Sequence, residues 1–192
     1  MIVLRCAGAD SGDGVKITID IDGVKNTLTV SAEDFLNSGI KKGDTDFDFE
    51  ALQEAEKSYT ARRAALRIIG AGQCSKTKLY EKLRRRGFSH ECAKNASDYV
   101  ADCGYIDEEW QIESYLRDLV EKRYFGKRKV TLMLLAKGYS AGKINAVIEK
   151  KYSNEDFAIF KHKLLEKTFG KVKPETREEA LEMKKVLYKQ GF

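Results

Sequence analysis

The chain contains a single proline, Pro174, among its 192 residues. Because proline interrupts helices, this scarcity favours a mostly helical protein. No run of about 18 apolar residues occurs, so no transmembrane helix is expected, and residues 1–6 are too short to form a signal peptide. The four cysteines show no CxxC spacing, which indicates a reduced, cytoplasmic protein.

The sequence also lacks the residue patterns of an enzyme. Its two histidines, His90 and His162, lie in no recognisable catalytic triad motif. Cys92 and Cys103 fall on a predicted apolar helix stripe, which favours core cysteines over a metal site. The glycine-rich segment 8–14 carries acids where a phosphate loop needs Gly-Lys-Ser/Thr, so it is expected to be a surface turn. We therefore expect no catalytic site, cofactor or metal.

Charge is unevenly distributed along the chain. Residues 1–56 hold 5 Lys+Arg and 12 Asp+Glu, a net charge of −7, whereas residues 57–143 carry +9 and residues 144–192 carry +3. The basic middle segment suggests a polyanionic or acidic partner. An alternative is an interaction scaffold that uses the acidic N-terminal segment to bind a basic partner.

A short phrase recurs at a nearly fixed interval. Gly87-Phe88-Ser89 returns as Gly138-Tyr139-Ser140, and the chain stops on Gly191-Phe192, with intervals of 51 and 53 residues between the aromatic positions. Self-similarity of this kind indicates one supersecondary unit that is copied along the chain to give an extended surface.

Periodicity and capping signals predict the elements. Alternation over 15–21, the Asp22-Gly23 turn and a returning strand over 28–30 predict a β-rich module at 1–48. Three-helix repeats follow at 49–104 and 105–152, and a truncated third repeat at 153–192. The fold class is therefore mostly α with tandem repeats behind a small β-rich module. The first helix of the second repeat is expected to bury an apolar face made of Trp110, Ile112, Tyr115, Leu116 and Leu119.

These repeats resemble the RecX regulators of the RecA recombinase. The resemblance is carried by the stretches Ala61–Leu66, Leu79–Phe88, Gly104–Asp107, Gly126–Lys129 and Leu135–Ser140. It implies a protein that is not an enzyme, lodges in the groove of the RecA–single-stranded DNA filament, and hinders its growth, ATP hydrolysis, strand exchange and coprotease activity. Binding to single- or double-stranded DNA and a monomeric state are also expected. Trp110-Gln111 stands where the family pattern usually has Phe-Ala, and the third repeat is shorter than usual.

Basic residues that recur in register are the predicted contacts with the filament or DNA. They are Lys78, Lys82, Arg84, Arg85, Arg86, Lys127, Arg128, Lys129, Lys137 and Lys143. A solvated face that complements helix dipoles is the simpler interpretation of the same residues. A helical nucleic-acid-binding protein that acts independently of RecA is the alternative function. Phe88, Tyr139 and Phe192 are expected to pack inside their own repeats rather than stack on bases.

Overall fold

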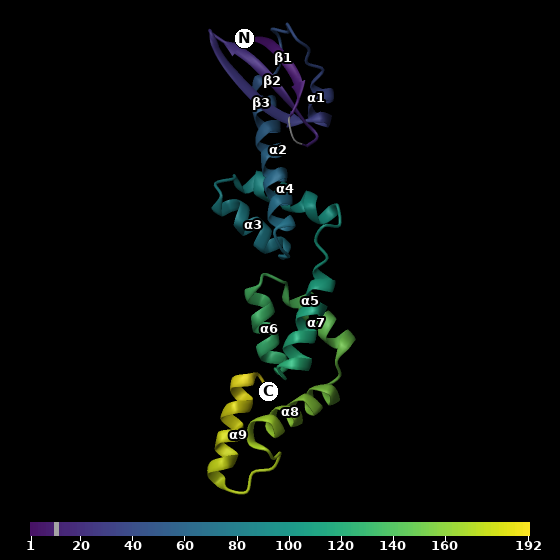
Figure 1. The fold of residues 1–192 in the computed structure, drawn as a ribbon, viewed down its shortest axis with the longest axis vertical. Coiled ribbons are helices and arrows are strands. Elements are labelled where there is room, and N and C mark those ends of the chain that lie inside the picture. The colour runs from purple at the N-terminus through teal and green to yellow at the C-terminus, as the bar shows by residue number, and fades with distance from the viewer. Residues whose placement is uncertain (10–11) are drawn as a thin grey trace. The chain divides into compact units, whose positions relative to one another are not determined.

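A computed structural model describes residues 1–9 and 12–192 as two compact units (Figure 1). Unit 1 comprises Met1–Gly72 and Leu79–Tyr105, and unit 2 comprises Gln73–Lys78 and Ile106–Phe192. Asp10 and Ser11, which belong to the glycine-rich segment that was expected to be a surface turn, lie outside the described residues. The predicted combination of a small β-rich module with a mostly helical remainder is confirmed.

The N-terminal module is an antiparallel sheet of order β1-β2-β3, formed by Ile2–Gly8, Gly14–Ile21 and Val24–Ser31. The predicted Asp22-Gly23 turn has positive φ at both residues, 53° and 86°, as a type I′ hairpin requires. Strand β1 was not predicted, because a register shift between Val3 and Arg5 breaks its alternation. Helix α1 (Ala32–Ser38) follows directly.

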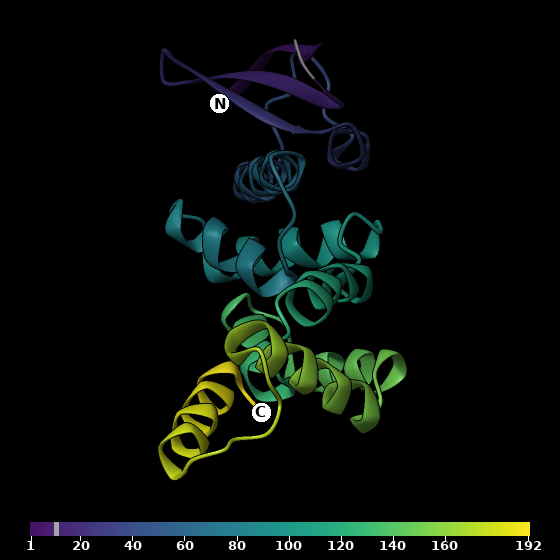
Figure 2. The same ribbon diagram turned by 60° about the horizontal axis from the view of Figure 1, so that its bottom comes forward.

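Helix α2 (Phe49–Gly70) lies against one side of the sheet (Figure 2). Leu52 joins the buried sheet cluster, whose other members are Val3, Ile17, Ile19, Leu28, Val30 and Ile40. The edge strand β3 also bonds to the helix, since the Thr29 N–H donates to the Glu56 carboxylate at 3.0 Å. The sheet is therefore fixed on the helix that opens the first repeat.

Helices α3 (Lys76–Arg85) and α4 (His90–Asp102) complete the segment that is predicted to be the first repeat. Leu79 and Leu83 are fully buried, and α4 buries Cys92, Ala93, Ala96 and Val100. The prediction that Cys103 belongs to the core is wrong, and Tyr99 is exposed as well. Cys103 lies beyond the last turn of α4, and Tyr99, 41% exposed, lies at the edge of the stripe with the Arg62 guanidinium 5.2 Å from its ring centroid.

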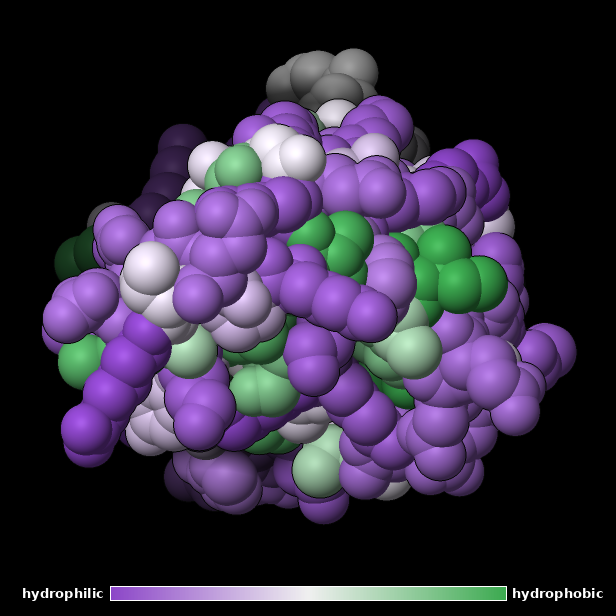
Figure 3. Space-filling model, turned by 90° about the horizontal axis from the view of Figure 1, so that it is seen from below, coloured by the Kyte–Doolittle hydropathy of each residue, from purple (hydrophilic) through white to green (hydrophobic). Residues whose placement is uncertain are grey.

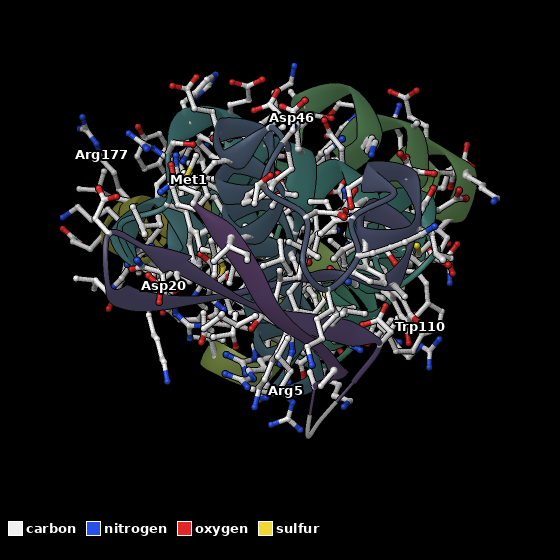
Figure 4. The ribbon with its side chains drawn as sticks, turned by 90° about the horizontal axis from the view of Figure 1, so that it is seen from above. Met1, Arg5, Asp20, Asp46, Trp110 and Arg177 are labelled. Carbon is white, nitrogen blue, oxygen red and sulfur yellow. The ribbon has the colours of Figure 1, made fainter. Side chains whose placement is uncertain are left out.

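The segment that is predicted to be the second repeat contains α5 (Glu108–Leu116), the π-helix η1 (Arg117–Lys122), α6 (Lys127–Ala136) and α7 (Ala141–Lys151). The prediction that Trp110 belongs to the core is wrong: it is 54% exposed and lies at the rim of the view in Figure 4. Trp110 is two residues from Ile112, about 200° around the helix. Gln111 is buried instead and accepts a hydrogen bond from the Tyr139 hydroxyl at 2.8 Å.

Helices α8 (Asn154–Phe169) and α9 (Arg177–Gln190) occupy the remaining chain. Ser153 and Asp156 form a capping box at the start of α8, and Thr176 caps α9. Helix α9 has 14 residues, whereas α3 and α6 each have 10. Among the described residues, no helix combines the length and apolar composition needed to cross a membrane.

The recurring Gly-aromatic phrase forms the same corner at the end of α3, α6 and α9. Gly87, Gly138 and Gly191 have φ values of 91°, 85° and 89°, in the left-handed region that glycine adopts without strain. In each corner the N–H of the following aromatic residue bonds back five residues, as in a Schellman motif; the donors are Phe88, Tyr139 and Phe192. The sequence repeat is thus a repeat of backbone conformation.

Candidate functional site

The last turns of α2 and α3 enclose a cationic depression of about 370 Å³ within unit 1. Four of its six lining residues are basic; the lining consists of Arg67, Ile68, Ala71, Lys82, Arg85 and Arg86. Lys82, Arg85 and Arg86 were predicted contacts, whereas Arg67 was not. We call this surface the α2–α3 depression.

Helix periodicity explains why these side chains converge. Leu79 and Leu83 of α3 are fully buried, so Lys82 and Arg85 lie on the part of the helix that is left uncovered. Arg67 is in the last turn of α2, four residues before Ala71. Cations are favoured at helix C-termini, and two C-terminal turns that lie together concentrate them.

The cations of the depression are weakly engaged inside the chain. Arg85 pairs with Glu81 at 3.7 Å, and both side chains are substantially exposed, so the pair contributes little stability. Within the residues that the structure describes, no ion pair involves Arg67, Lys82 or Arg86. Arg84 points elsewhere, since its guanidinium donates to the Phe88 carbonyl at 2.6 Å. The depression can therefore accept an external anion without breaking a strong internal contact.

The other predicted cations belong to unit 2, and three of them have partners there. These contacts join Lys127 to Glu149 at 3.6 Å, Lys143 to Glu108 at 2.6 Å, and the Lys137 ammonium to the Tyr115 ring centroid at 4.3 Å. The Lys127–Glu149 pair is exposed on both sides and exchanges easily with solvent or with another charged partner. Glu108 is only 11% exposed and also accepts from the Lys76 N–H, so the Lys143–Glu108 pair is more firmly held.

Arg128 and Lys129 contact the C-terminal segment. The Arg128 guanidinium donates to the Tyr188 carbonyl at 2.5 Å and lies 3.9 Å from the Tyr188 ring centroid. The Lys129 ammonium donates to the Gln190 side-chain oxygen at 2.6 Å and lies 3.8 Å from the Phe125 ring centroid. Burial, followed by the nearby Lys189 charge, lowers the pKa of Lys129. These two cations hold helix α9 to helix α6.

Lys78 also belongs to unit 2, although it lies on α3. Its backbone N–H donates to the Ser75 hydroxyl at 3.2 Å, and its side chain is half-buried beside Gly138. The ten predicted contacts therefore fall into two sets. Lys82, Arg84, Arg85 and Arg86 are in unit 1, and the other six are in unit 2.

No metal site accompanies these surfaces in the part of the chain that the structure describes, where no group of three or more His, Cys, Asp or Glu could hold an ion. Cys92 is buried, and its thiol lies 3.7 Å from the Glu54 carboxylate. The Nδ1 atom of His90 makes a 2.8 Å hydrogen bond with the Tyr80 hydroxyl.

No family model matches the chain. Curated relatives do match it, and each is named regulatory protein RecX. The protein from Caldanaerobacter subterraneus subsp. tengcongensis is 26% identical over 184 residues, 92% of this chain and 87% of the relative. The protein from Clostridium perfringens strain 13 is 28% identical and covers 77% of this chain and 69% of the relative. The protein from Halorhodospira halophila is 29% identical and covers 70% of this chain and 82% of the relative.

Two solved structures share the fold. A crystal structure of a regulatory protein RecX superposes with a TM-score of 0.79 at 18% identity, covering 100% of this chain and 94% of that one. The crystal structure of RecX from Lactobacillus salivarius gives a TM-score of 0.61 at 18% identity, covering 72% of this chain and 90% of that one.

Proposed function

We propose that this chain, a member of the RecX family, regulates a RecA recombinase by binding its filament on single-stranded DNA. It acts mainly as an inhibitor and restrains ATP hydrolysis, strand exchange and coprotease activity. The observation that carries the proposal for this chain is the α2–α3 depression, where Arg67, Lys82, Arg85 and Arg86 converge without strong internal partners. Its function rests on binding rather than on chemistry at a catalytic site.

A filament of RecA on DNA is a long polyanionic or acidic-lined target. Each cation that neutralises a phosphate releases condensed counterions, so affinity rises with the number of cations engaged and falls with salt. Arginine is suited to this role, because its planar guanidinium can donate two parallel hydrogen bonds to one phosphate or carboxylate. Three of the four cations in the depression are arginines.

The unit 2 cations divide into contact residues and holding residues. Lys78, Lys127, Lys137 and Lys143 are candidates for further contacts, and the exposed pair of Lys127 with Glu149 is the one most easily exchanged for an external anion. Arg128 and Lys129 are assigned to holding α9, because an external anion would have to displace short internal hydrogen bonds.

The test is DNA-dependent ATP hydrolysis by RecA at fixed moderate salt, with this protein titrated in. A variant with Arg67, Lys82, Arg85 and Arg86 changed to alanine tests the depression. The matched control loses four exposed lysines that have no ion pair among the described residues; it changes Lys94, Lys161, Lys173 and Lys185 to alanine. Suppression well below the amount that coats the DNA, lost in the first variant and kept in the second, supports the proposal.

A nucleic-acid-binding protein that acts independently of RecA is the second candidate, because the same cations could bind DNA alone. Such a protein would lower hydrolysis only at amounts that saturate the DNA. It would also bind naked single-stranded DNA as tightly as it binds the filament. Either result would replace filament regulation by general DNA binding.

A further inference from the structure

Helices α3, α6 and α9 are equivalent elements of successive repeats. Within unit 2, the corner at the end of one of these helices contacts the N-terminus of the equivalent helix in the preceding repeat. The Gly138 corner at the end of α6 meets the start of α3 at Ser75. The Gly191 corner at the end of α9 meets the start of α6 at Gly126 and Lys129. Ser75 and Gly126 are 51 residues apart, which is the period of the repeat. One contact geometry is therefore used twice.

Both contacts satisfy groups that a helix end leaves unpaired. The Ser75 hydroxyl accepts from the Lys78 N–H at 3.2 Å and donates to the Lys137 carbonyl at 2.8 Å. At the next contact, the Gly126 N–H donates to the Gln190 carbonyl at 2.8 Å. In each case the residue before the corner glycine supplies the carbonyl, and the helix start supplies the donor.

The absence of a side chain at the corner makes the approach possible. A Cβ atom added at Gly138 would lie 2.7 Å from the Ser75 hydroxyl oxygen, and one added at Gly191 would lie 2.6 Å from the Lys129 Cβ. Such distances require the neighbouring chain to move. The corner glycines thus serve both the left-handed turn and the contact.

The Gly87 corner has the same conformation but no such neighbour. A Cβ atom added at Gly87 would have no heavy atom within 4 Å. Gly87 is exposed and Phe88 is only half-buried. The first repeat therefore presents a complete corner, formed by Arg86, Gly87 and Phe88, that contacts no helix start in the described chain.

The start of α9 is the matching unoccupied helix end. Thr176 accepts from the Glu179 N–H at 3.1 Å, as Ser75 accepts from Lys78. Unlike Ser75, it donates to no acceptor in the part of the chain that the structure describes. Residues 175–178 are exposed, and Arg177 extends outward in Figure 4. Beside this helix start lies a hollow of about 360 Å³ that includes Leu181, which is 55% exposed.

The repeated corner geometry carries the case for this contact, and charge adds one complementary group. Arg84, Arg85 and Arg86 precede the open corner, whereas the open helix start is mixed in charge: Glu175, Glu178 and Glu179 lie there with Arg177, and Lys184 lines the adjoining hollow. Lys171 pairs with Glu175 at 3.2 Å and with Glu179 at 2.9 Å. Glu178 has no ion pair within the described residues and is available to an external cation.

We propose that the Arg86-Gly87-Phe88 corner of one copy docks on the start of α9 in a second copy, with Thr176 donating to the Arg86 carbonyl and Glu178 facing the arginines. The two surfaces are different, so the contact is heterologous and repeats from copy to copy instead of closing a symmetric dimer. It is small, so free chains are monomers when dilute. Copies bound side by side on one long target would associate through their high effective concentration.

The competing mode is an apolar, symmetric dimer through the exposed side of α8 and α9. The molecular face shown in Figure 3 does not favour it: the surface is mainly hydrophilic, and the hydrophobic side chains lie in separate small groups. Ile159, Leu181 and Tyr188, each more than half exposed, are the large hydrophobic residues concerned, and the Tyr188 ring already contacts the Arg128 guanidinium. Scattered apolar residues of this kind are normal on a monomer surface.

Sedimentation equilibrium of the protein alone, up to about 1 mM, tests the proposal. The variants are Arg86→Glu and Glu178→Arg. Their matched controls are Lys94→Glu in unit 1 and Glu155→Arg, which makes the same change in the first turn of α8. Neither DNA nor RecA is present, so failure here leaves the proposed regulatory function untouched.

The weight-average mass of the parent should rise with concentration past that of a dimer. Each reversal should weaken association at least tenfold, an equimolar mixture of the two variants should restore it, and both controls should behave like the parent. A mass that stays monomeric at about 1 mM, a plateau at the dimer, or reversals without effect would each overturn the proposal.

Discussion

The basic middle helices of the first and second repeats, α3 and α6, end in the same glycine corner but make different contacts. In the first repeat, Arg67, Lys82, Arg85 and Arg86 line an open depression, and Gly87 has free space around it. In the second repeat, Gly138 packs on Ser75, and at the start of its middle helix Arg128 and Lys129 are bonded to the C-terminal segment.

This difference teaches that a repeated motif does not imply a repeated function. An internal copy of the motif is covered by its neighbour, while the copy at the start of the array is left uncovered. The uncovered copy is the one available to a partner. Arg86 lines the open depression, whereas Lys137, at the equivalent position 51 residues on, lies 4.3 Å from the Tyr115 ring centroid, so equivalent cations have different surroundings in the two repeats.

The corner glycines should separate the two repeats most strongly. Gly138→Ala should lower the free energy of unfolding by about 2–5 kcal/mol. The clash of the added methyl group with the Ser75 side chain contributes about 1–3 kcal/mol, and the left-handed backbone conformation of an alanine contributes the rest. Gly87→Ala should cost only the backbone strain, about 1–2 kcal/mol. Urea denaturation of the two variants measures both, and equal losses would remove the distinction between a covered and an open corner.

The paired change Arg128→Ala and Lys129→Ala should reduce stability rather than binding. Losing two charged hydrogen bonds and two ring contacts should cost about 1–3 kcal/mol of unfolding free energy. Affinity for the RecA filament should stay within a factor of about two at a temperature where the variant is folded. A large loss of affinity without a loss of stability would show that these residues contact the target directly.

Glu81→Gln should have the smallest effect, in the opposite direction. It frees Arg85 from its exposed partner and raises the net charge of the depression by one. Binding to single-stranded DNA, measured by fluorescence anisotropy at low salt, should strengthen by about twofold. Weaker binding would mean that Glu81 itself helps to position the contact. Glu149→Gln, next to Lys127, is the matched change in unit 2.

Local signals allowed most elements to be predicted from sequence. The hydroxyls of Ser31, Ser75, Ser89 and Ser140 each accept from the N–H three residues on, and such a local cap can be recognised from the sequence. The π-helix η1 and the positive φ of Tyr124 were not predicted, since neither leaves a local sequence signal.

The site depended on packing that the sequence does not show. Arg67 and Lys82 are separated by a helix break, and only the packing of α2 and α3 brings them together. The internal partners of Lys129 lie at Phe125 and Gln190, and the second of these is 61 residues away. The prediction for Trp110 was wrong because it relied on the apolar side chain and not on the helix angle, which places Trp110 on the opposite side of α5 from the buried Ile112.

The most direct test of the account is the salt dependence of binding to the RecA filament, measured for the parent and for the variant with Arg67, Lys82, Arg85 and Arg86 changed to alanine. If the α2–α3 depression makes the contact, the slope of log affinity against log salt should shrink by about 3, or about 0.7 for each cation removed. The control lacking Lys94, Lys161, Lys173 and Lys185 should keep the parent slope. An unchanged slope in the depression variant, or equal changes in both variants, would contradict the account.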